Sequence, residues 1–145
     1  MIRRNLLDLN VLIALTEPDH IHHGKTQKWF DSSSNQSLGI CPLTEAGFVR
    51  ITTSTSFQPA PHSLEQAIGI LQVLKGHVAY SYWEIRESWV SLTAPFSARI
   101  SGHQQITDAY LLGLAIKESG ALVTFDKAIK YMAGPQFADN LLILE

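Results

Sequence analysis

The sequence predicts an α/β fold in which helices cover both faces of a mainly parallel central sheet. Short apolar runs typical of strands alternate with segments of helical spacing, and such alternation favours parallel strands joined by right-handed crossovers. The chain has 145 residues, of which 46% are hydrophobic, which is ample for one shared core. We therefore expect residues 1–145 to form a single domain with three layers, helix, sheet and helix.

The first part of the chain predicts strand, helix, helix and strand. Leu6 and Leu7 are typical of a strand, and residues 11–15 favour a short helix that ends near Pro18. Residues 22–31 carry aromatic side chains on a polar background, as an amphipathic surface helix does. Residues 37–41 predict the next strand.

A helix is predicted to begin at Pro42, because proline suits the first helical position. Glu45 then lies in its first turn, and apolar residues follow on one face of the helix. Thr52–Pro61 is rich in Ser, Thr and Pro and predicts a loop.

The clearest helix of the sequence follows that loop. Ser63 and Gln66 have the spacing of a capping box, apolar residues repeat at helical spacing as far as Leu74, and Gly76 stands at the C-terminal position. Residues 78–83 then predict a strand.

The last third predicts helix, strand, helix and strand. Thr107 is predicted to cap a helix that ends at Gly120. The remaining elements are a buried strand over residues 121–125, a helix over 127–132 and a final strand over 141–144.

Composition restricts the classes of protein to which the chain can belong. The longest apolar stretches are only a few residues long, far below the ~20 that span a bilayer. The start of the chain lacks the pattern of a signal peptide, so export is not expected. Cys41 is the only cysteine, which excludes an internal disulfide, favours a packed thiol over a nucleophile and agrees with a reducing cytoplasm.

The net charge of −2 argues against a protein that coats nucleic acid through bulk positive charge. Any RNA would have to meet a local basic patch.

Four acids fall where an α/β fold places functional groups. Asp8 and Asp126 lie just past predicted strand ends, and Glu45 and Asp108 lie in first helical turns, so all four can share the carboxyl edge of the sheet. Two carboxylates ~5 Å apart repel by about 3 kcal/mol at an effective dielectric near 20. A hard divalent cation such as Mg²⁺ or Mn²⁺ would offset this repulsion and could activate water for phosphodiester hydrolysis.

Each acid also has an ordinary structural interpretation. Asp108 and Glu45 could stabilise helix N-termini, Asp126 could cap the last helix, and Asp8 could make a turn. Taken singly these interpretations are favoured, and only the convergence of the four acids outweighs them.

Four segments, in order along almost the whole chain, match the motifs of a known family. The first resembles the opening motif of PIN domains, and the second resembles the segment that carries the second acid of VapC toxins. The other two resemble the segments that carry the third and the fourth acid. They are Leu6–Leu15, Cys41–Ile51, Gly102–Leu112 and Leu122–Lys127.

This resemblance to VapC toxins of the PIN-domain family implies a PIN-like fold, a homodimer, dependence on Mg²⁺ or Mn²⁺, and endoribonuclease activity restrained by a cognate VapB antitoxin. It also implies roles for individual residues. Asp8, Glu45, Asp108 and Asp126 would bind or organise the metal, with Asp8 and Asp108 as direct ligands. Asn10 and Thr124 would orient these acids.

Other residues are weaker candidates for function. Arg50 could reach a substrate phosphate or pair with an acid, and His103 could contact RNA or make a structural hydrogen bond. His20, His22 and His23 lack the fourth ligand of a closed zinc site, so we expect a solvated loop there.

Aromatic and basic side chains could also serve RNA binding, although core or dimer packing suits the aromatics better and ordinary surface charge suits the basic residues. The aromatics are Tyr80, Tyr82, Trp83 and Trp89, and the basic residues are Arg99, Lys127 and Lys130.

Two other functions stay open from the residues. A non-catalytic module of the same fold could hold a partner's arginine in the acidic pocket. A nuclease of RNA maturation, or one that acts on DNA, would carry the same acids.

Overall fold

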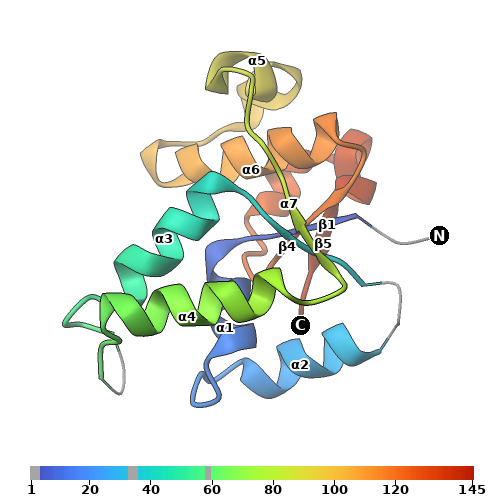
Figure 1. Ribbon diagram of the computed structural model, residues 1–145. Coiled ribbons are helices and arrows are strands. Elements are labelled where there is room, and N and C mark those ends of the chain that lie inside the picture. The colour runs from blue at the N-terminus through green and yellow to red at the C-terminus, as the bar shows by residue number, and fades with distance from the viewer. Residues whose placement is uncertain (1–3, 33–35, 58–59) are drawn as a thin grey trace.

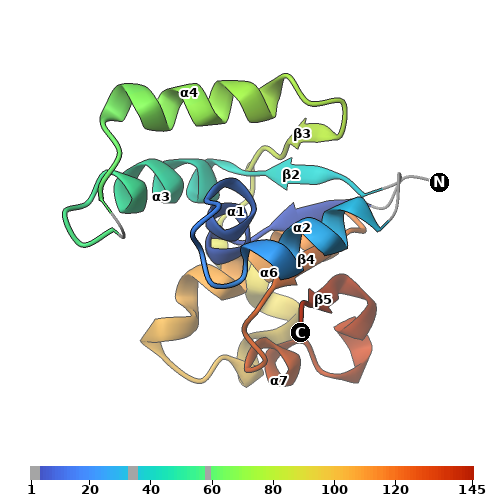
Figure 2. The ribbon, with the colours of Figure 1, turned by 90° about the horizontal axis from the view of Figure 1, so that it is seen from below.

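In the computed structural model, five parallel strands form one sheet in the order β3-β2-β1-β4-β5. The structure describes residues 4–32, 36–57 and 60–145. Figure 2 shows the strands following one another from β3 to β5. They are β1 (Asn5–Leu7), β2 (Leu38–Ile40), β3 (Tyr80–Tyr82), β4 (Ala121–Thr124) and β5 (Leu141–Ile143). The predicted α/β class with a parallel sheet is confirmed.

Four helices cover one face of the sheet, and Figure 1 shows three of them, α1, α2 and α4, below the strands. Their apolar side chains share a core cluster with Leu7 and Val123 of the two central strands. The helices are α1 (Leu9–Thr16), α2 (His23–Asp31), α3 (Pro42–Thr52) and α4 (Leu64–Lys75).

The other face is covered by the second half of the chain. Leu6 and Leu122 face this side, because neighbouring residues of a strand point to opposite faces, and the buried Trp83 and Phe96 join them. The elements are α5 (Trp89–Thr93), η1 (Ala94–Arg99), η2 (His103–Gln105), α6 (Ile106–Lys117), α7 (Ile129–Ala133) and η3 (Pro135–Asn140). The two clusters establish the predicted three-layer arrangement.

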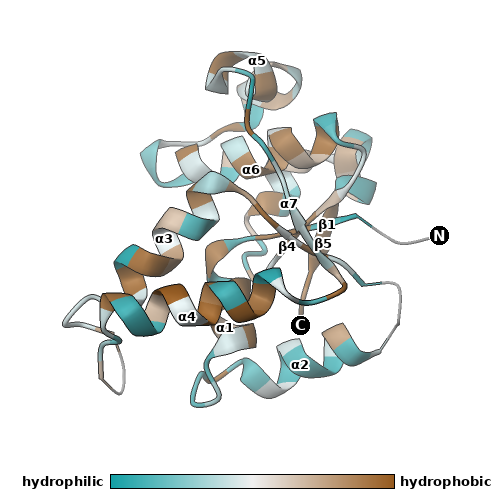
Figure 3. Cartoon of the chain, in the orientation of Figure 1, coloured by the Kyte–Doolittle hydropathy of each residue, from teal (hydrophilic) through white to brown (hydrophobic). Residues whose placement is uncertain are grey.

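Figure 3 shows the hydropathy that this layering requires: the central strands are apolar, whereas α2 on the outside is largely polar. None of the helices in the described part of the chain is both long and apolar enough to cross a membrane.

Helix boundaries test the predicted caps. Ser63 accepts a hydrogen bond from the backbone N–H of Gln66, whose side chain accepts one from the N–H of Ser63, so the capping box is confirmed. The cap predicted at Thr107 is wrong. The turn η2 runs directly into α6, which therefore begins at Ile106 with no side-chain cap.

Two further segments differ from the sequence prediction. The last helix begins at Ile129 and not at Lys127, because Asp126 first closes a turn onto Ala128. The helices α5 and η1, between β3 and α6, were not predicted. The predicted loop Thr52–Pro61 begins with the last residue of α3, and residues 58 and 59 lie outside the described residues.

Candidate functional site

Three aspartates converge at the carboxyl edge of the sheet. Asp8 directly follows β1, Asp126 follows β4, and Asp108 lies in the first turn of α6. Burial raises the pKa of Asp108 to about 6, and the negative charges of Asp8 and Asp126 add to the shift. The three carboxyl groups are therefore close enough to repel one another.

Asp8 is the buried member of this group. Burial is the main reason that its pKa lies above the usual value, and the charge of Asp126 acts in the same direction. Three hydrogen bonds oppose the shift: the backbone N–H of Val11 donates to Oδ1 at 3.1 Å, the Thr124 hydroxyl donates to Oδ2 at 2.5 Å, and the backbone N–H of Asn10 acts in the same direction. The first of these bonds makes Asp8 the N-cap of α1.

Thr124 connects two of the acids. Its Oγ1 donates to Asp8 and also accepts the backbone N–H of Asp126 at 3.1 Å. The residue is fully buried at the end of β4. The position of Asp126 relative to Asp8 is thus fixed by one side chain of the central sheet.

Asp126 is the exposed member. Its Oδ1 accepts the backbone N–H of Ala128 at 2.9 Å, so it closes a turn, and its charge also acts on Asp8 and Asp108. The cap made by Asp8 and the turn closed by Asp126 coexist with the convergence of the three carboxylates, and neither local role requires that convergence.

A cavity of about 620 Å³ opens beside Asp108 and Asp126. Apart from these acids its walls are polar and almost uncharged, with His103 as the only other titratable side chain. The exposed loop before α6 supplies most of the lining, which consists of Ser101, Gly102, His103, Gln104, Gln105, Asp108, Asp126 and Ala128. This geometry leaves room for a phosphodiester chain next to the acids.

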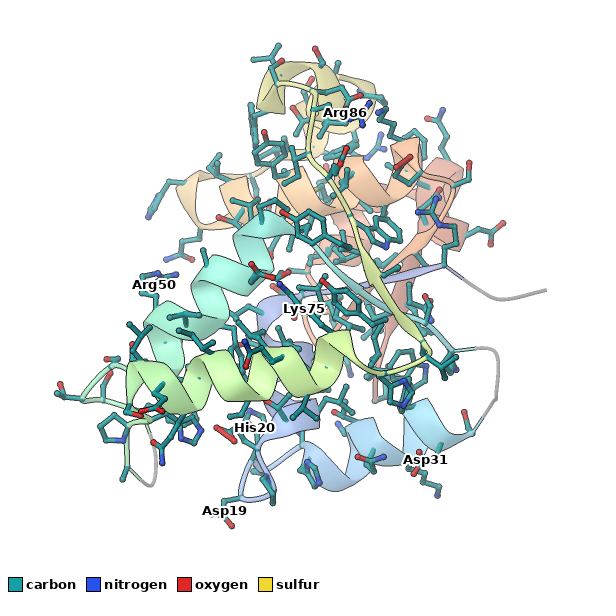
Figure 4. The ribbon with its side chains drawn as sticks, in the orientation of Figure 1. Asp19, His20, Asp31, Arg50, Lys75 and Arg86 are labelled. Atoms are coloured by element: carbon teal, nitrogen blue, oxygen red, sulfur yellow. The ribbon has the colours of Figure 1, made fainter. Side chains whose placement is uncertain are left out.

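Glu45 takes a different partner from the three aspartates. Its Oε2 lies 3.5 Å from Nζ of Lys75, at the end of α4, and makes no hydrogen bond there. Figure 4 shows Lys75 between α3 and α4, on the side of α3 that faces α4. Among the described residues, the charges that raise the pKa values of Asp8 and Asp108 come from the aspartates of this group and not from Glu45.

A family model described as "PIN domain" matches residues 6–135. The chain belongs to the PIN-domain family. Ribonuclease VapC39 of Mycobacterium tuberculosis is 36% identical over 124 residues, which are 86% of this chain and 89% of the relative. Ribonuclease VapC38 of the same organism is 37% identical over 128 residues, 88% of this chain and 89% of the relative. The chain is therefore a PIN domain of the VapC ribonuclease family.

Solved structures share the PIN fold at low sequence identity. A structure titled as VapBC2 from Rickettsia felis bound to a promoter DNA fragment has a TM-score of 0.61 and 17% identity, and it covers 100% of this chain and 98% of its own. A toxin-antitoxin complex from Klebsiella pneumoniae has a TM-score of 0.63 and 13% identity, with 98% of both chains covered. These likenesses establish the fold.

Two other predicted site residues of this PIN domain, Asn10 and Arg50, make no side-chain hydrogen bond or ion pair with the acids among the described residues. Asn10 is exposed on α1 and lines a separate cavity of about 350 Å³ with Glu17, Asp19 and His20. In the described part of the chain, no hydrogen bond joins its side chain to an acid. Arg50 is exposed and extends from α3 into solvent (Figure 4).

The remaining candidates are mainly structural. Trp83 is buried in the core, as its spacing predicted. His20, His22 and His23 lie in the turn before α2 and at its start, and His23 contacts the carbonyl of Ala14. Within the described residues, no three His, Cys, Asp or Glu side chains are grouped so that they could hold a metal ion together.

The chemistry of the aspartates suits a magnesium-like ion. Such an ion prefers carboxylate oxygen, is usually held by only one or two carboxylates and keeps several waters. Asp8 is buried and oriented by Thr124, Asp108 is partly buried with a raised pKa, and both share the repulsion that a cation would remove. The donor set fits this type of ion.

Proposed function

We propose that the protein is a metal-dependent endoribonuclease that acts as the toxin of a VapBC-type toxin-antitoxin system. The observation that carries this proposal is the convergence of the buried Asp8 with Asp108 and Asp126 at the carboxyl edge of the sheet. Relatives that are named ribonucleases match this chain over most of their length, and they support the assignment of RNA as the substrate.

In this proposal Asp8 and Asp108 hold Mg²⁺, or Mn²⁺ in its place, with Asp126 beside them. Glu45 is the fourth acid, and its ion pair with Lys75 engages only Oε2. Thr124 orients Asp8 through its hydroxyl. Asn10 is assigned the same role of orienting the acids. His103, at the cavity beside Asp108, and Arg50 contact the substrate.

The reaction is hydrolysis of a phosphodiester bond of RNA. The bound ion supplies water that is more acidic than bulk water and a positive charge that stabilises the departing oxygen. Asp8 and Asp108 would act as anions in this arrangement, and because their pKa values are raised, protons would compete with a cation for these carboxylates as the pH falls. Thr124 holds Asp8 in one orientation through its hydroxyl.

The proposed partners follow from the same assignment. One solved neighbour is titled a toxin-antitoxin complex and another VapBC2, and we assign a VapB-type antitoxin to this chain as well. We further propose that residues 1–145 form one PIN domain, that the toxin is a homodimer, and that it acts on RNA in the cytoplasm.

The test is incubation of purified protein with total bacterial RNA in Mg²⁺, in Mn²⁺ and in EDTA. The Asp8→Asn variant is the matched control, because it keeps the size of the side chain and removes its charge. We expect discrete fragments that require the metal ion and disappear in the variant, and sequencing of their ends would identify the cleavage site.

Other outcomes would point to the other functions. Cleavage that is equal in EDTA and in the Asp8→Asn variant would overturn the metal site. Metal-dependent cleavage of DNA in place of RNA would assign a different substrate, and binding of a partner without any cleavage would favour a non-catalytic module.

A further inference from the structure

Most Lys and Arg side chains of the described residues are engaged with a carboxylate or a backbone carbonyl. These side chains are Arg4, Lys75, Arg86, Arg99, Lys117 and Lys127. Across the described residues, no carboxylate lies within ion-pair distance of Lys25, Lys28, Arg50 or Lys130. A polyanion that approaches a chain with a net charge of −2 therefore finds only a few cations that no carboxylate neutralises, and which of them it contacts depends on where they lie relative to the acidic site.

Lys25 is the unpaired cation that lies next to the acidic site. Its Nζ lies 5.6 Å from the centre of the Phe125 ring, a cation–π distance, and Phe125 directly precedes Asp126 in the sequence. Lys25 belongs to the first turns of α2, and its partly buried side chain lies against this ring.

His22 packs against the same ring. The centres of the His22 and Phe125 rings are 4.7 Å apart, with an angle of 39° between the ring planes. All three side chains are partly exposed. His22, Lys25 and Phe125 therefore form a basic aromatic platform, which is the combination that binds unpaired nucleotides: a cation for the phosphate and a ring for the base.

The platform and the 620 Å³ cavity belong to opposite faces of the sheet, near the end of β4, which Asp126 follows. Phe125 packs with the core cluster of the face that α1 and α2 cover. The cavity is formed by the loop before α6 and by Ala128, on the other face. An RNA strand that passes over Asp126 would thus meet the polar cavity on one side and the platform on the other.

We infer that the platform of His22, Lys25 and Phe125 is a nucleotide subsite for single-stranded RNA directly next to the cleavage site. Lys25 binds a backbone phosphate and the imidazole of His22 stacks on the adjoining base. The subsite rests on the proposed ribonuclease function, since it identifies where that enzyme holds its substrate.

The experiment measures binding of a fluorescein-labelled single-stranded RNA by anisotropy, in EDTA to prevent cleavage, over a series of salt concentrations. We expect Lys25→Gln to weaken binding about 5- to 10-fold and to reduce the slope of log K against log salt by about 0.7, the loss of one phosphate contact. Lys25→Arg should keep the slope of the parent.

Lys28→Gln is the matched control. Lys28 lies on the same helix, is exposed and has no ion-pair partner among the described residues, so its loss should leave the affinity within about 2-fold and the slope unchanged. His22→Ala should weaken binding about 5-fold with an unchanged slope, because stacking is independent of salt, and His22→Phe should restore it.

The outcomes distinguish a failure of the proposed subsite from a failure of the proposed ribonuclease function. If Lys25→Gln binds as the parent does, or if Lys28→Gln weakens binding as much as Lys25→Gln, the subsite is wrong even when the parent cleaves RNA. If the parent neither binds nor cleaves RNA, the ribonuclease assignment itself fails.

Discussion

Thr124 is the single residue on which most of the site geometry depends. Its hydroxyl donates to Asp8 and accepts the backbone N–H of Asp126, and the side chain is fully buried. A buried hydroxyl with both functions used cannot rotate without breaking one of the bonds. The backbone of Asp126 is therefore held in place relative to the carboxylate of Asp8 before any ion binds.

Thr124→Val should weaken the site without changing its shape, because valine has nearly the same volume and no hydroxyl. We expect the free energy of unfolding to fall by about 1–2 kcal/mol, since the Asp126 N–H loses its acceptor. The pKa of Asp8 should rise further, because the bond from Thr124 lowers it. We also expect Mg²⁺ to bind about 10- to 100-fold more weakly.

Thermal unfolding over a titration of Mg²⁺ would measure both effects. Thr124→Ser, which keeps the hydroxyl, should bind the ion nearly as the parent does. Equal Mg²⁺ affinities for Thr124→Val and the parent would show that Thr124 has no part in orienting the acids.

At the scale of elements, the capping box was predicted correctly from local signals and the cap at Thr107 was not, and contacts that depend on long-range packing were not predicted. The capping box at Ser63 and Gln66 requires only neighbouring residues, and it was confirmed. The helix α5 has five residues, too few for a periodic pattern, and it packs against α6. No local pattern reports a contact of that kind.

The candidate site shows the same difference between local signals, which the sequence reveals, and tertiary contacts, which it does not. Strand ends and first helical turns placed Asp8, Asp108 and Asp126 at one edge, and the structure brings these three together. The ion pair of Glu45 with Lys75 joins residues of two different helices, and the stacking of His22 on Phe125 joins residues of opposite ends of the chain. Such contacts depend on the tertiary fold.

Gly113 shows how closely α5 and α6 approach. A Cβ at this position would lie 2.5 Å from the backbone oxygen of Leu92 in α5. Gly113→Ala should therefore push the two helices apart and lower the free energy of unfolding by about 1–3 kcal/mol. Denaturation by urea would measure the change.

Gly69→Ala is the control for this prediction. Gly69 lies inside α4, and a Cβ there would meet no atom within 4 Å. Alanine should then stabilise the protein by about 0.5–1 kcal/mol through its better helix propensity. If both variants were stabilised, the close packing of α5 on α6 would not exist in solution.

At the scale of the whole molecule, the protein concentrates negative charge at one edge, where the three aspartates repel one another. In the metal-free protein this repulsion lowers the free energy of unfolding by an amount that depends on pH. Asp108 has a usual pKa of 3.8 in an unfolded chain and a pKa of about 6 when folded. Between these values the folded state binds more protons than the unfolded state, so stability must fall as pH rises from about 4 to about 6.

The expected size of this loss follows from the pKa shift. A shift of about 2 units corresponds to about 3 kcal/mol at 1.36 kcal/mol per unit. Because Asp108 is partly exposed and solvent screens its charge, we expect about 1–2 kcal/mol. Asp8 adds to the loss in the same direction, since its pKa is also raised.

Asp108→Asn should remove most of this pH dependence and all of the RNA cleavage. In EDTA at pH 7 we expect the variant to be about 1–2 kcal/mol more stable than the parent, because one of the three repelling charges is gone. Mg²⁺ should stabilise the parent and leave the variant nearly unchanged, since the ion compensates the same repulsion. Urea denaturation at several pH values between 4 and 7, with EDTA or with Mg²⁺, measures each of these differences.

The opposite result would be a variant that unfolds more readily than the parent in EDTA at pH 7. Asp108 would then stabilise the start of α6 as an ordinary helix-terminal acid, and the interpretation of the three aspartates as a metal site would lose its electrostatic basis.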